Sequence, residues 1–385
     1  MSFWFLFNYL LSSNFISGHL FSKREEKKTL TRSICILFFL IVVLSSCVNK
    51  EILDDVRIAT AVGFELAENE ELKVTAVVPN YMPDKTITNE VATETARINK
   101  EAREKLDRTK SRPYVSGKIE VLVYSKEISE KGLMPYIDSY FRDPTVGSKI
   151  FLTVTDSDIQ GLLQYQYGTR DNGMYISDMI EHNINVGSLP TTNFHDFLNS
   201  YYAEGKDPFL PLIRQIDNEI KIIGNALFKD DKLVGEIPED KLFTFKSLMD
   251  RKTSQDSITI EMDKEKYAFL HKIKSNRTFK FDNVEKTKEF TININIEGLI
   301  HEYSGGKIDK KMAEEITKKT KEQITSQAEE MIKTFQELET DPLGLGEHVR
   351  SHTKNWDSKK WYETYPNLNV TVNTKVKLTE TGIIE

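Results

Sequence analysis

The stretch TININIEGLI, residues 291–300, places isoleucine at every second position from 292 to 296. Because successive side chains of a strand point to opposite faces, this alternation predicts a strand with one buried and one polar face. Further strand-like runs lie nearby in the chain: SITIEM (257–262), KYAFLHKIK (266–274), RTFKF (277–281) and the alternating run 368–378. Consecutive strands without helices between them favour antiparallel pairing. The C-terminal half is therefore predicted to contain a mainly antiparallel sheet.

One long helix is predicted to pack on that sheet. Within residues 309–339 apolar side chains recur on one side and Lys and Glu fill the other, with Asp309 as the N-cap. The apolar spacing is closer to about 3.6 residues than to strict heptads, which favours a helix on a sheet over a coiled coil. Asp341-Pro342 ends the helix. The expected fold of this half is α+β.

The N-terminal half alternates strands and helices, which gives it an α/β character. The run IEVLVY (119–124) is almost fully apolar and predicts a strand buried on both faces. Other expected elements are a hairpin of 57–64 with 72–78, a mostly exposed helix within 84–112, a helix beginning near 133 because of Pro135, and a strand at 151–155. The whole chain is predicted to be a mixed α+β protein of several modules.

A linker is predicted at GKDPFLPL (205–212), because two prolines and a glycine fall within eight residues. A hairpin over 220–237 and a helix through 242–248 follow it. We therefore expect a leader and signal peptide at 1–46, an N-terminal domain of one or two modules at 47–212, and a C-terminal domain at 213–385.

A signal sequence precedes the globular part. Residues 34–44 are eleven consecutive apolar residues, ICILFFLIVVL. This run is shorter than the roughly 20 residues that a membrane span needs, and it suits a signal-peptide core preceded by the basic segment 23–32. Leu44, Ser45, Ser46 and Cys47 then match a bacterial lipobox, in which the cysteine thiol takes the lipid and cleavage occurs before it. Cys47 is the predicted lipid attachment site; the alternative is an uncleaved anchor helix.

Residues 1–22 form a second apolar stretch that no signal peptide requires. We expect the true start to lie downstream of it, at Leu20 or Leu30 read as an initiating methionine. The alternative is an additional membrane segment.

Charge and cysteine content exclude several classes of protein. Without residues 1–46 the chain carries 47 basic and 57 acidic side chains, a net charge of −10. A chain with this net negative charge is not a general nucleic-acid binder, because contacts to phosphates need concentrated positive charge. Cys35 and Cys47 are the only cysteines, so the part after Cys47 can form neither a disulfide framework nor a cysteine zinc site.

No catalytic or cofactor motif is found: the P-loop, the nucleophile elbow and the H-E-x-x-H pattern are all missing. His348 and His352 are four residues apart but lack an evident third ligand, so no metal site is predicted. Asp156 and Asp158 fit a helix N-terminus better than a calcium loop. Trp356 and Trp361 are expected to pack in or beside the core. The sequence identifies no catalytic residue, no cofactor and no ligand-binding residue.

Four blocks, taken together in this order, resemble a known family. They are EILDDVRIATAVGFEL (51–66), SGKIEVLVYSKEISEKGLMPYIDSYFRDP (116–144), GNALFKDDKLVGEI (224–237) and DPLGLGEHVRSHTKNWDSKKWYETYPNLNVTVNTKVKL (341–378). With the lipobox before them, they resemble the Ger(x)C family, the lipoprotein C subunits of GerA-type nutrient receptors of spore germination. Many members carry tryptophan directly after the lipidated cysteine, where this chain has Val48.

The resemblance implies a non-enzymatic subunit, lipid-anchored at the outer face of the spore inner membrane. Its implied partners are two polytopic proteins, an A and a B subunit, with which it would sense small nutrients. Two other classes remain open from the residues. A solute-binding lipoprotein would need a cleft between two doubly wound lobes, and a cell-wall hydrolase would need paired carboxylates or a metal.

Overall fold

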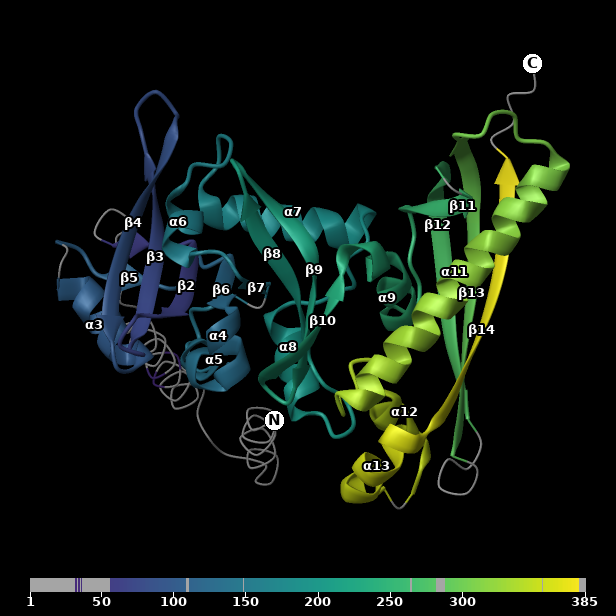
Figure 1. The fold of residues 1–385 in the computed structure, drawn as a ribbon. Coiled ribbons are helices and arrows are strands. Elements are labelled where there is room, and N and C mark those ends of the chain that lie inside the picture. The colour runs from purple at the N-terminus through teal and green to yellow at the C-terminus, as the bar shows by residue number, and fades with distance from the viewer. Residues whose placement is uncertain are drawn as a thin grey trace, which may run out of the picture. The chain divides into compact units, whose positions relative to one another are not determined.

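The computed structural model describes residues 56–380 apart from 109–110, 148, 264, 282–287 and 355, together with residues 32, 34 and 36 (Figure 1). Contacts divide the chain into Met1–Asp54 and Asp55–Glu385. In the first unit the three described residues are helical. Apart from residues 32, 34 and 36, the predicted signal peptide lies outside the described residues, as do the lipobox and Cys47. None of the described helices combines the length and apolarity that a membrane crossing requires.

An eight-stranded sheet dominates the second unit, in the order β10-β9-β8-β7-β6-β2-β3-β4. The four central strands run parallel, and an antiparallel hairpin extends the sheet on each side. The strands are β2 (Ala61–Leu66), β3 (Leu72–Tyr81), β4 (Ile87–Ala96), β6 (Val121–Ser125), β7 (Phe151–Thr155), β8 (Phe209–Ile216), β9 (Glu219–Lys229) and β10 (Lys232–Pro238). A separate parallel pair joins β1 (Arg57–Ile58) to β5 (Tyr114–Val115).

Helices cover both faces of this sheet. One face packs against α3 (Asn99–Arg108), α4 (Lys126–Lys131), α5 (Met134–Phe141) and α8 (Phe194–Tyr202), the other against α6 (Ile159–Gln164) and α7 (Asn172–Val186). Strand β6 lies between the two cores: Leu122 enters one and Val123 the other, and both are fully buried. This confirms the predicted strand buried on both faces.

One predicted helix of the N-terminal half is shorter in the structure, and another begins where it was expected. Only Asn99–Arg108 of the segment 84–112 is helical, because residues 87–96 form β4 and pair antiparallel with β3 along their whole length. The segment 127–141 divides into α4 and α5 at Gly132, whose φ of 119° breaks the helix. Helix α5 begins at Met134 with Pro135 in its first turn, as predicted.

Part of the segment predicted as a linker, residues 209–212, belongs to a strand. Phe209, Leu210 and Leu212 are buried in β8, and the carbonyl of Pro211 accepts a hydrogen bond from Thr153 Oγ1 at 2.8 Å. The prolines are tolerated because β8 pairs with β7 only at Leu212 and Ile213. The expected boundary between 212 and 213 therefore falls inside a strand, and the sheet continues through β9 and β10.

A second sheet has four strands in the order β11-β12-β13-β14. They are β11 (Asp256–Asp263), β12 (Lys266–Phe281), β13 (Glu289–Tyr303) and β14 (Asn369–Glu380). The first three pair antiparallel, whereas β14 pairs parallel with β13. The sheet is mainly antiparallel, as predicted, but the two strands expected at 266–274 and 277–281 form the single strand β12, with register shifts.

Helix α11 (Lys310–Glu337) runs along this sheet (Figure 1). Its buried side includes Ile316, Ile324 and Phe335. Asp309 caps it by accepting a hydrogen bond from Met312 N at 2.8 Å, which confirms the predicted N-cap. The shorter elements of this region are η2 (Glu239–Lys241), α9 (Leu242–Met249), α12 (Leu345–His352), α13 (Ser358–Thr364) and η3 (Tyr365–Asn367). The fold is mixed α+β.

Candidate functional site: the aspartate junction

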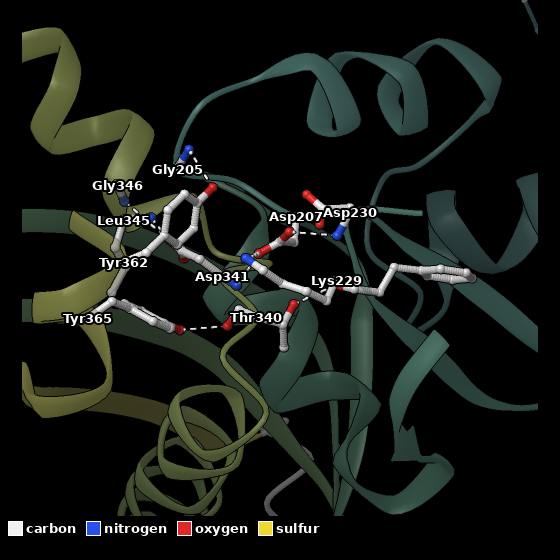
Figure 2. Close-up of polar contacts among 11 residues, drawn as sticks. Gly205, Asp207, Lys229, Asp230, Thr340, Asp341, Leu345, Gly346, Tyr362 and Tyr365 are labelled. Carbon is white, nitrogen blue, oxygen red and sulfur yellow. Dashed lines mark hydrogen bonds and ion pairs between the residues drawn. The ribbon is translucent and has the colours of Figure 1, made fainter. Parts of the chain in front are cut away.

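Two buried aspartates join distant parts of the chain. Asp207 precedes β8, and Asp341 lies between α11 and α12 (Figure 2). Each side chain is about 1% exposed. We call these two residues, with Gly205, Lys229 and Gly346, the aspartate junction.

The carboxylate of Asp207 contacts donors of three other residues. Its carboxylate accepts hydrogen bonds from the backbone N–H of Asp341 at 2.7 Å and of Asp230 at 3.0 Å. Lys229 Nζ lies 3.2 Å from Asp207 Oδ2. In return, the N–H of Asp207 donates to the carbonyl of Asp341 at 2.9 Å. A buried carboxylate is stable only when it is paired and hydrogen-bonded. Asp207 meets this requirement through Lys229, Asp230 and the loop between α11 and α12 that contains Asp341.

Asp341 holds the start of α12. Its Oδ1 accepts from Leu345 N at 3.0 Å and its Oδ2 accepts from Gly346 N at 2.8 Å. A negative charge at a helix N-terminus satisfies free N–H groups and complements the helix dipole. Burial raises the pKa of Asp341 to about 7, although the hydrogen bonds from Gly346 and Leu345 act in the opposite direction.

Two glycines allow the backbones to meet. Gly205 has a φ of +82°, and a Cβ there would lie 2.6 Å from the carbonyl carbon of Gly346. A Cβ on Gly346 would lie 2.4 Å from Trp361 Nε1. The N–H of Glu347 donates to the Gly205 carbonyl at 2.9 Å across this contact. Neither position has room for a side chain.

Aromatic residues of α13 and η3 cover the junction. Tyr365 is buried, and its hydroxyl donates to the Thr340 carbonyl at 2.8 Å. Lys229 Nζ lies 4.2 Å from the centre of the Tyr362 ring, a cation–π contact. Trp361 is buried with its ring centre 5.8 Å from that of Trp356. The predicted packing role of the two tryptophans agrees with this arrangement.

The contacts of the aspartate junction hold together segments that are distant in the sequence. Backbone N–H groups occupy the oxygens of both carboxylates, and Lys229 forms an ion pair with Asp207. Sequence reasoning missed the site, although Lys229 and Asp341 both lie in blocks that carry the family resemblance. The missing signal was the pairing of Asp207 with Asp341, which are 134 positions apart.

The other sequence candidates lie elsewhere. The rings of His348 and His352 are 4.7 Å apart and pack against Phe281. Across the part of the chain that the structure describes, no three His, Cys, Asp or Glu side chains gather as a metal site would require. Asp158 caps α6 through Gly161 N at 2.7 Å, as expected of a helix N-terminus, and Asp156 pairs with Arg214.

Two domain profiles match this chain over most of its length. The one described as "Spore germination protein N-terminal domain" matches residues 49–215, and "Spore germination B3/ GerAC like, C-terminal" matches residues 223–382. The chain belongs to the GerAC family of spore germination proteins. This confirms the resemblance drawn from the sequence, and the chain is a GerC-type subunit of a spore germinant receptor.

Relatives of this GerC-type subunit match most of its length. Spore germination protein GerQC of Bacillus cereus is 28% identical over 355 residues, 91% of this chain and 99% of its own length. Spore germination protein A3 of Bacillus subtilis (strain 168) is 24% identical, over 87% of this chain and 93% of its own. The crystal structure of the GerBC protein has the same fold, with a TM-score of 0.50 at 11% identity over 85% of this chain and 99% of that one.

Proposed function

We propose that this GerC-type subunit is a lipoprotein, anchored through a diacylglyceryl group on Cys47 to the outer face of the spore inner membrane. It works there with two polytopic partners, the A and B subunits of the same receptor, in germination triggered by small nutrients. The observation that carries the proposal is the position of the family match, which begins at residue 49, two residues after Cys47. Cleavage before Cys47 would release the whole family region with a lipidated N-terminus.

We also infer that the subunit is not an enzyme. The buried carboxylates, Asp207 and Asp341, are occupied by backbone donors that hold loops together. A general base needs a free oxygen facing a substrate, and neither aspartate offers one. The role that fits these contacts is assembly of the receptor by a rigid domain.

The solute-binding alternative does not match this fold. Such a protein was expected to have two doubly wound lobes with parallel sheets. Here the second sheet is mainly antiparallel, with α11 along one side. No comparison with known proteins favours that alternative.

Lipidation is tested directly by mass spectrometry of the mature N-terminus, which should carry diacylglycerol on Cys47. An unmodified Cys47 within an uncleaved chain would overturn the proposal.

The role of the anchor is tested with Cys47→Ala. We expect this variant to lose nutrient-triggered germination through its receptor, because tethering raises the local concentration of partners, on the order of 10²–10⁴ in avidity. The control retethers the same domain by an unrelated transmembrane helix. Rescue supports a tethering role, whereas failure at normal abundance would mean that the lipid itself takes part.

A further inference from the structure

A pocket of about 640 Å³ lies beside the aspartate junction. Its wall includes Lys206, Arg251 and Arg277, which come from the loop before β8, the segment after α9, and β12. Phe279 and Leu343 supply apolar surface, and Glu347 is the carboxylate on the wall. Three permanent cations converge from separate parts of the sequence on one concavity.

Arg277 forms no ion pair with any residue that the structure describes. Its Nε and Nη1 are buried without a hydrogen-bond partner, and its guanidinium lies 3.8 Å from the centre of the Phe279 ring. Burial lowers the pKa of Arg277 to about 10, with Asp250 acting in the opposite direction. Arg277 is partly buried, and a partly buried cation without an ion-pair partner is unfavourable, so an anion in the pocket would stabilise it.

The neighbouring cations are also available. No ion pair or side-chain hydrogen bond joins Lys206 or Arg251 to any residue that the structure describes. Arg277 N donates to the Arg251 carbonyl at 3.0 Å, which holds the two arginines side by side. At Gly344 a Cβ would lie 3.2 Å from Lys206 Cδ, so the glycine leaves room for the lysine stem along the pocket.

Three carboxylates lie near these cations: Asp250 interacts electrostatically with Arg277, Asp196 interacts with Lys206, and Glu347 lies on the pocket wall. Asp250 is engaged by Thr191, whose backbone N lies 3.3 Å from Oδ1, and burial raises the pKa of Asp250. Glu347 forms no ion pair with Lys206, although both approach Gly344. Burial lowers the pKa of His348, so its ring adds no charge at neutral pH.

We propose that this pocket binds a small oxyanion, a phosphate or carboxylate group, with Arg277 as its principal contact and Arg251 and Lys206 as supporting charges. Guanidinium groups suit such groups because their planar N–H donors match the oxygens of carboxylate and phosphate. Phe279 and Leu343 would face an organic portion of the ligand. This site goes beyond the assembly role and does not depend on it.

The test titrates inorganic phosphate into the full chain in detergent, by calorimetry at constant ionic strength. We expect saturable binding with one site per chain. Arg277→Gln should weaken it by at least about tenfold and Arg277→Lys by a smaller factor, because lysine keeps the charge but loses the planar donors. Arg251→Gln, at an exposed position, tests the site without disturbing the core. The matched control is Lys274→Gln, an exposed lysine on β12, the strand that contains Arg277.

A second arm separates the sources of the phosphate group. Glycerol 3-phosphate represents a soluble ligand, and phosphatidylglycerol vesicles represent a lipid headgroup. The site is supported if the chain binds either probe and if Arg277→Gln and Arg251→Gln lose that binding. Near-ultraviolet circular dichroism verifies that each variant is folded. The proposal is overturned if no arm shows saturable binding, or if folded Arg251→Gln and Arg277→Gln bind as tightly as Lys274→Gln.

Discussion

The two sheets of this protein differ in how many of their faces are covered. Helices lie on both faces of the eight-stranded sheet, so adjacent residues of β6 enter two different cores. In the four-stranded sheet α11 lies on one side, and Asn295, Asn373 and Lys375 are exposed on the other. The sequence of each sheet follows from this difference: VLVY is continuous in β6, whereas TININI alternates in β13. A strand's pattern therefore reports how many of its faces are covered.

The part of the chain around the eight-stranded sheet contacts the part around the four-stranded sheet through two kinds of buried charged group. The aspartate junction uses carboxylates that accept backbone N–H groups. The second contact is an ion pair between Lys246 of α9 and Asp256 of β11, with Nζ and Oδ1 2.8 Å apart and both side chains buried. Lys246 Nζ also donates to the carbonyls of Ile184 and Gly187 at the end of α7, at 2.9 and 2.6 Å. It thereby joins a helix of the first sheet to a strand of the second.

Breaking this ion pair is expected to have the largest effect. Lys246→Met leaves Asp256 buried without its cation, which should lower the free energy of unfolding by about 3–5 kcal/mol. Urea unfolding of the purified chain measures the change. The double variant Lys246→Met with Asp256→Leu should recover most of the loss, because it removes both charges. A double variant no more stable than the single one would contradict the account.

Adjacent substitutions in the two sheets test the comparison itself. In β6, Leu122→Ala should cost about 2–5 kcal/mol and Val123→Ala at least about 1 kcal/mol, because each leaves a cavity in a different core. In β13, Ile294→Ala should cost about 2–5 kcal/mol, but exposed Asn295→Ala should stay within about 0.5 kcal/mol. A large loss for Asn295→Ala, measured by the same urea titration, would show that the open face is covered.

The pH dependence tests the aspartate junction. The pKa of Asp341 is raised to about 7 in the folded state, so the folded chain holds this proton more tightly than the unfolded chain. The resulting stability is fully present below the ordinary aspartate pKa and is lost as pH rises through about 7, by about 2 kcal/mol between pH 5 and 7. Asp341→Asn should flatten this part of the profile. An equal slope in wild type and variant would assign it to other groups.

The smallest effect is expected on the outer side of α11. Lys333 and Glu337 form an exposed ion pair one helical turn apart, with N···O 3.6 Å. Lys333→Ala should change the free energy of unfolding by less than about 0.5 kcal/mol, because exposed pairs gain little over their hydration. A loss above 1 kcal/mol, on the order of a buried contact, would indicate that this side of α11 is packed against another part of the protein.

The sequence alone determined the features that depend on local periodicity. The alternation of β13, the apolar run of β6, the Asp309 cap and the start of α5 near Pro135 each follow from which side chains can face a core, satisfy a nearby N–H group or restrict the backbone. Four ordered blocks were also enough to place the chain in its family, because their spacing is a property of the sequence itself.

Only the tertiary structure decided the features that depend on a distant partner. Residues 87–96 form a strand because β3 offers a matching edge, and residues 209–216 form β8 because its side chains enter two cores. Asp207 and Asp341 look like ordinary turn residues until the fold brings them together. Local patterns indicate which side chains are buried. A buried charge or a strand edge, however, is stabilised by a partner that can lie a hundred or more residues away, and local sequence patterns do not identify that partner.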